Sequence, residues 1–193
     1  KLEKTDDAVV YFPSREVQIV QQQLTKAQYK QLGAEGVKYL LEEYVIIPVE
    51  QMKVFSHFEQ PDQVSILGVA NHAVATMQHA LALLPIKVTA LLPDFLMLPI
   101  TENNQIVLAN INGRLLVREN EFLGNSIDDL ALYLDYVPKD RHYLYSGLSD
   151  EQVESLFAAV PSDQRGSFVF QLAEIKKPKQ HSYNVLPKAK TES

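Results

Sequence analysis

The fold class follows from residues 64–92, which read VSILGVANHAVATMQHALALLPIKVTALL. A short apolar run at 64–69 predicts a buried strand, and Asn71 can cap a helix whose apolar residues recur at helical spacing. Pro85 ends that helix, and a second apolar run at 87–92 is typical of another strand. Strand, helix and strand predict a βαβ unit whose second strand lies parallel to the first. The sequence therefore predicts a mixed α/β (α+β) fold.

The residues before this unit predict a strand pair and a helix. Residues 8–12 form an apolar run, and residues 16–20 alternate polar and apolar side chains, as a half-buried strand does. Thr25 and Gln28 fit a capping box, which predicts the start of a helix that ends before Pro48.

Two glycines fall inside this predicted helix. Gly33 and Gly36 each cost a helix about 1 kcal/mol relative to alanine. Because that cost needs a compensating gain, we expect another backbone to pack closely against the helix at these positions.

The residues after the βαβ unit predict a β-rich second part. Residues 105–109 and 114–118 flank an Asn112-Gly113 pair, in which both residues tolerate positive φ and so favour a hairpin turn. Residues 167–172 are typical of a further strand.

The chain is long enough for two small lobes with buried cores, since it has 193 residues. We expect a first lobe over residues 1–100 and a second over residues 101–175. Residues 176–193 contain five lysines and two prolines, and they have no acid before Glu192, which predicts a basic linker outside the core. Such a linker suits the cytoplasmic flank of a membrane helix, but an ordinary tail is an equal alternative.

Composition excludes several functions. Hydrophobic residues make up 46% and charged residues 22%, as in globular proteins, and the net charge of −6 argues against nucleic-acid binding. The absence of cysteine rules out disulfides, thiolate zinc sites and a cysteine nucleophile. The sequence also lacks the glycine-rich phosphate loops and the serine-hydrolase and zinc-protease motifs. We therefore expect no enzyme activity and no cofactor.

Three groups of residues were weighed as candidate sites. His72 and His79 share a helix face, but no further residue stands at metal-ligand spacing, so we expect no metal site. Glu42 and Glu43 close the first predicted helix, where the helix dipole disfavours negative charge, which hints at a partner or at a cation within this chain. A solvated helix end is the simpler alternative.

A pair of arginines gives the third group. Arg114 and Arg118 share one face of a predicted strand, so they could hold a carboxylate of a partner. They could equally pair with Asp94 or Glu119 inside this chain, or stay solvated, and we favour the internal or solvated alternatives. The residues that we predict to contact a partner are Glu42, Glu43, Asp94 and Arg118.

Three segments resemble one bacterial family. They are VKYLLEE at 37–43, the stretch from GVAN at 68–71 to LLPDFLMLP at 91–99, and RLLVR at 114–118. In order and spacing they resemble the cytoplasmic domain of the type II secretion system inner-membrane protein L. Leu115 stands where that family often has tryptophan, and the sequence after residue 130 is less similar.

The resemblance implies an actin-like, or ribonuclease H-like, fold with a degenerate nucleotide site. It implies further strands before Ala8 and a single membrane helix after the lysine-rich tail, neither of which is part of this chain. It also implies a scaffold on the cytoplasmic side of the inner membrane. The implied partners are the N-terminal domain of the secretion ATPase, platform proteins of the protein M class and, as an open alternative, a second copy of the chain.

Two other functions remain as alternatives to this scaffold. The first is an actin-like nucleotide-binding protein of the pilus-assembly kind, which would need carboxylates at its hairpin turns. The turn at residues 110–113, NING, lacks one. The second is a hydrolase with a dispersed acid pair, which no motif supports.

Overall fold

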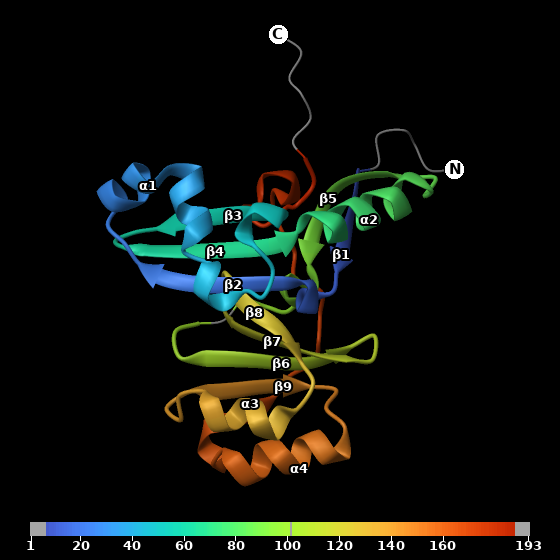
Figure 1. The fold of residues 1–193 in the computed structure, drawn as a ribbon. Helices are drawn as coiled ribbons and strands as arrows, with labels where there is room; N and C mark the ends of the chain where they lie inside the picture. The colour runs from blue at the N-terminus through green and yellow to red at the C-terminus, as the bar shows by residue number, and fades with distance from the viewer. Residues whose placement is uncertain (1–6, 101, 188–193) are drawn as a thin grey trace. The chain divides into compact units, whose positions relative to one another are not determined.

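The computed structural model describes residues 7–100 and 102–187, and the chain divides into two compact units (Figure 1). Unit 1 contains the residues up to Pro93 together with those from Ile175, and unit 2 runs from Asp94 to Glu174. The elements of unit 1 are β1 (Asp7–Phe12), η1 (Ser14–Glu16), β2 (Val17–Gln23), α1 (Lys26–Tyr39), η2 (Glu42–Tyr44), η3 (Val49–Gln51), β3 (Met52–Glu59), β4 (Gln63–Ala70), α2 (Asn71–Ala82), β5 (Lys87–Pro93) and η6 (Pro178–Gln180). Those of unit 2 are η4 (Asp94–Met97), β6 (Gln105–Ile111), β7 (Arg114–Asn120), β8 (Leu123–Ile127), α3 (Leu130–Tyr136), β9 (His142–Ser146), α4 (Asp150–Ala159), η5 (Ser162–Gln164) and β10 (Arg165–Ser167). In the described ranges, no helix combines the length and the apolar character needed to span a membrane.

The strands of unit 1 pair differently from the prediction. A three-stranded antiparallel sheet has the order β2-β4-β3, and a separate two-stranded sheet pairs β1 with β5 in parallel. The predicted β1–β2 pair is therefore wrong, and so is the predicted βαβ unit, because β4 and β5 lie in different sheets. A strand has only two hydrogen-bonding edges, and those of β4 are taken by β2 and β3, so β5 pairs with β1 instead.

Helix α1 begins as predicted but has a break. The Thr25 side chain accepts a hydrogen bond from the Gln28 amide, and the Gln28 side chain returns one to Thr25, which completes the capping box. Gly33 has φ 64° and ψ −176°, a conformation open essentially to glycine alone. The expected close approach of another backbone is wrong, since a Cβ at Gly33 would meet nothing within 4 Å and the three atoms nearest to one at Gly36 belong to the Leu32 side chain. Backbone conformation explains Gly33.

The core of unit 1 lies between α1 and the three-stranded sheet. Val37 and Leu41 come from α1 and the turn after it, and Val20, Val64 and Ile66 come from β2 and β4. All five are buried, and Tyr29 stacks on Phe58 at the edge of the same cluster with 5.7 Å between ring centroids. This cluster fixes the start of the segment that follows α1.

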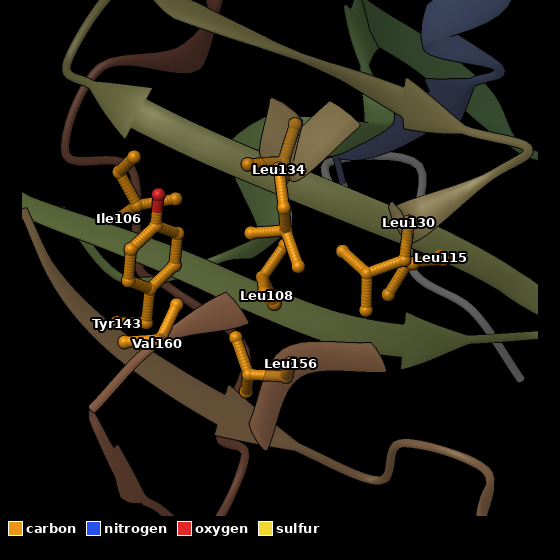
Figure 2. Packing of buried hydrophobic residues seen from close by; sticks show 9 residues of the cluster. Ile106, Leu108, Leu115, Leu130, Leu134, Tyr143, Leu156 and Val160 are labelled. Atoms are coloured by element: carbon orange, nitrogen blue, oxygen red, sulfur yellow. The ribbon is translucent and has the colours of Figure 1, made fainter. Parts of the chain in front are cut away.

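Unit 2 is built on a five-stranded sheet with the order β10-β9-β6-β7-β8. The predicted hairpin is present: β6 and β7 pair antiparallel, and Asn112 and Gly113 adopt φ of 53° and 78°. Helices α3 and α4 cover one face of the sheet, and Figure 2 shows their Leu134 and Leu156 among the apolar side chains of the strands. This cluster is the core of unit 2.

The predicted strand at residues 167–172 is wrong beyond its first residue. The pairing of β10 with β9 ends at Ser167, and Phe168 and Phe170 instead pack against Leu98, which follows η4, and against buried side chains of β6 and β7. Phe168 and Phe170 do point to the same side of the chain, as the alternating pattern predicted, but both rings pack on the face of the sheet and the segment does not join it as a strand.

The predicted basic linker from residue 176 also differs in the structure. Tyr183 and Val185 are fully buried in unit 1. The Val185 amide donates to the Leu91 carbonyl at 3.0 Å, and the Leu91 amide donates to the Asn184 side chain at 2.9 Å. Residues 181–186 thus form a strap that closes one edge of β5, and two apolar residues flanking Asn184 were too short a pattern to reveal it.

Candidate partner-binding surface

The segment between α1 and β3 carries Glu42 and Glu43, the two acids predicted to contact a partner. Helix α1 ends at Tyr39, so the acids lie in the separate turn η2 and not in the last turn of one long helix. Both side chains are exposed. The helix dipole therefore gives no reason to expect a partner at these acids. The remaining reason is that both side chains are exposed.

Buried residues anchor this segment at both ends. Leu41 is fully buried and Val49 nearly so, and both belong to the core of unit 1. The Tyr44 amide donates to the Leu41 carbonyl at 2.8 Å, and the Gln51 amide donates to the Pro48 carbonyl at 2.9 Å. The residues between the anchors are thereby held in an ordered turn that faces outward.

Apolar side chains are exposed beside the two acids. Tyr44 is half exposed and Ile46 is fully exposed, although large apolar residues contribute most to stability when buried. Tyrosine is enriched among the residues that dominate binding energy at protein interfaces. Neither residue was predicted to contact a partner, because both fall within the predicted first helix and Tyr44 stands at the spacing of its apolar face.

A further tyrosine and acid extend the same surface. The Tyr39 hydroxyl donates to the Glu50 carboxylate at 3.3 Å, and the negative charge of Glu50 raises the pKa of Tyr39 above its ordinary value. We define the acidic loop surface as Tyr39, Glu42, Glu43, Tyr44, Ile46 and Glu50. It combines negative charge with exposed apolar area, so its chemistry fits a basic protein surface with an apolar centre.

Arg118 lies in the interior of unit 2 and is only 3% exposed. Its guanidinium donates to backbone carbonyls, at 2.7 Å to Leu98, 2.8 Å to Glu121 and 3.2 Å to Asn120. It also lies over the Phe95 ring, 5.9 Å from the centroid. The guanidinium thus joins β7 to η4, and little of it is left for a partner to contact.

Asp94 is 7% exposed and begins η4. One of its carboxylate oxygens lies 3.9 Å from Arg114, which matches the internal pairing that the sequence analysis favoured for one arginine of the pair. The four residues predicted to contact a partner are thus divided between the units: Asp94 and Arg118 lie in unit 2, and Glu42 and Glu43 lie in unit 1.

The two histidines lie on the surface of α2. Both His72 and His79 are exposed, and within the residues that the structure describes no group of three His, Asp or Glu side chains could hold a metal ion.

Comparison with known families places the chain in one of them. The sequence model of the type II secretion system (T2SS) protein L family matches residues 2–184. The chain belongs to the protein L family. None of the curated proteins compared with the chain matches it.

A solved structure shows that the fold is shared with another secretion protein. It is the cytoplasmic domain of EpsL, an inner membrane component of the type II secretion system of Vibrio cholerae. The TM-score is 0.66 at 16% identity, over 89% of this chain and 71% of that chain. The match confirms the expected mixed α/β fold of the actin-like class.

The three segments that carry the protein L resemblance contact one another within the units. In unit 1, a Cβ added to Gly68 of the second segment would lie 2.7 Å from the Leu41 side chain of the first. In unit 2, Arg118 of the third segment donates to the Leu98 carbonyl of the second. In this protein L chain, the segments that resemble the family therefore pack against one another inside the two units.

Proposed function

We propose that this protein L chain is a scaffold that recruits the cytoplasmic secretion ATPase to the inner-membrane platform of the type II secretion system and catalyses no reaction itself. Membership of the family supports this function. The acidic loop surface carries the proposal for this chain, because it is an ordered, outward-facing combination of charge and apolar area. We assign it to the N-terminal domain of the ATPase as its binding site.

The proposed contacts are Glu42, Glu43, Tyr44 and Ile46. The carboxylates would speed association with a basic surface and orient it, and the apolar side chains would supply the buried centre of the interface. Asp94 and Arg118, which the sequence analysis also offered, are assigned to the stability of unit 2 because both are buried. Proteins of the protein M class are the proposed neighbours in the platform.

The test is a calorimetric titration of the chain with the N-terminal domain of its cognate ATPase. We expect saturable binding without added nucleotide, and a Kd at least about tenfold weaker for E42K/E43K, since close charge pairs across interfaces contribute more than 1 kcal/mol. Y44A/I46S should weaken binding to a similar extent.

The matched control reverses two exposed acids of unit 2, in E121K/E154K, and should bind as the unsubstituted chain does. Unchanged binding by E42K/E43K would contradict the assignment of the surface. Absence of ATPase binding, together with heat released on titration with ATP, would instead favour the actin-like nucleotide-binding protein of the pilus-assembly kind.

A further inference from the structure

Two segments of unit 1 contain no carboxylate side chain. Residues 63–93, which form β4, α2 and β5, have no Asp or Glu, and neither do residues 175–191. The chain as a whole has 24 Asp and Glu against 18 Lys and Arg. Acids are thus kept out of two separate stretches of a protein with an overall negative charge.

The structure brings the described parts of these segments together. The strap is hydrogen-bonded to Leu91 of β5, and Leu186 lines a hollow of about 300 Å³ with Leu84 and Ile86. Residues 177–180 line a second hollow with Thr89 of β5. Figure 1 shows α2 and β5 beside each other, joined by their turn at one end. The two acid-free segments are therefore one region of unit 1.

The turn between α2 and β5 exposes apolar side chains in this region. Leu83 is 87% exposed and Leu84 is 43% exposed. Lysines follow on both segments, and among the residues that the structure describes the exposed ones are Lys87, Lys176, Lys177 and Lys179. We define the lysine–leucine surface as Leu83, Leu84 and these four lysines. Acids border this surface: the Cα of Asp7 in β1 is the register partner of Lys87, and Glu35 and Glu50 line a pocket with Lys179.

We propose that the lysine–leucine surface binds an anionic lipid bilayer, with Leu83 and Leu84 inserted among the headgroups. Exposed leucines with flanking lysines are the combination that interfacial membrane binding requires: apolar side chains enter the boundary layer while cations meet anionic headgroups. A nucleic acid would engage the lysines alone and leave both leucines in water. This proposal rests on the proposed scaffold function at the inner membrane, and it adds that the folded unit 1 itself contacts the bilayer.

The first experiment uses the absence of tryptophan from the chain. L83W introduces a single reporter, whose fluorescence emission should shift to the blue on adding vesicles of phosphatidylglycerol and phosphatidylcholine, but not vesicles of phosphatidylcholine alone. The matched control is L132W, at an exposed leucine of α3 in unit 2, and its emission should not shift. Identical emission of L83W with and without anionic vesicles would overturn the proposal.

The second experiment measures co-sedimentation of the otherwise unsubstituted chain with the same vesicles. L83S/L84S should lower the apparent affinity about tenfold, because it removes the inserted apolar area and leaves every lysine in place. L132S/Y136S in α3 is the control and should bind normally. Equal binding by L83S/L84S, or equal binding of a DNA fragment without a vesicle shift, would assign any binding to the lysines alone and overturn the proposal. Leu83 lies outside the acidic loop surface, so ATPase titration of the same variants shows which proposal has failed.

Discussion

At the residue scale, the most informative side chain is Arg118, which a strand pattern alone marked as a partner contact. Its three donor directions point at three carbonyls, so the structure uses the planar fork of the guanidinium and not only its charge. Lysine carries the same charge on a single nitrogen and cannot reproduce those directions.

We therefore expect R118K to lower the free energy of unfolding of unit 2 by about 3 kcal/mol, since buried carbonyls would lose their partners. Arg114 provides the control, because its side chain is 38% exposed and lies 3.9 Å from Asp94. R114K should change stability by less than about 1 kcal/mol. Denaturant unfolding measures both, and equal effects would contradict the structural role of Arg118.

A second residue-scale prediction concerns Glu119 on β7. Burial raises the pKa of its carboxyl above the ordinary value of 4.5, and the nearby Tyr133 and Arg141 only oppose that shift. A raised folded-state pKa means that the folded protein binds the proton more tightly than the unfolded chain does. The stability contributed by Glu119 is therefore complete below pH 4.5 and is lost as the pH rises through the raised value.

E119Q should accordingly raise the Tm at pH 7 relative to the unsubstituted chain, and the difference should shrink towards pH 4. The exposed Glu121 gives the control, since E121Q should change stability by less than about 0.5 kcal/mol. Thermal unfolding between pH 4 and pH 8 is the measurement. A lower Tm for E119Q at pH 7 would mean that attraction to Arg141 outweighs burial.

At the element scale, the strap shows how a short segment becomes part of a sheet region distant in sequence. Tyr183 is buried and burial raises the pKa of its hydroxyl, while a hydrogen bond donated by the Ser65 hydroxyl of β4 opposes the shift. The Asn184 side chain accepts a hydrogen bond from the Leu91 amide, and the Val185 amide donates one to the Leu91 carbonyl on the edge of β5. The strap therefore does for β5 what a neighbouring strand would do.

N184A should open that edge. The Leu91 amide would lose its acceptor, so we expect its hydrogen exchange to quicken by about tenfold, the equivalent of a hydrogen bond of about 1 kcal/mol. Asn125 is a matched site in unit 2, and N125A should leave Leu91 unaffected. Unchanged exchange at Leu91 in N184A would show that Val185 and Tyr183 alone hold the strap.

At the scale of the whole molecule, the chain crosses from unit 1 to unit 2 at Pro93 and returns at Ile175. Each unit has its own sheet and its own buried cluster. The two proposed interaction surfaces both belong to unit 1: the acidic loop surface for the ATPase and the lysine–leucine surface for the bilayer. The two surfaces adjoin, because Glu50 of the acidic loop surface and Lys179 of the lysine–leucine surface line the same pocket.

The sequence by itself determined the features that depend on neighbours along the chain. The capping box at Thr25 and the hairpin at Asn112-Gly113 are local, because a few residues satisfy their own backbone groups. Periodicity likewise identified most strands, and the three family segments were enough for the fold class.

Only the tertiary structure decided which distant segments meet. Strand pairing depends on which edges are already occupied, so β5 joined β1 although the βαβ pattern favoured β4. Burial of Arg118 and Tyr183 depends on carbonyls and apolar side chains far away in the sequence. The exposure of Ile46 and Leu83 is equally non-local, because an apolar residue lies outside the core only when no other element covers it.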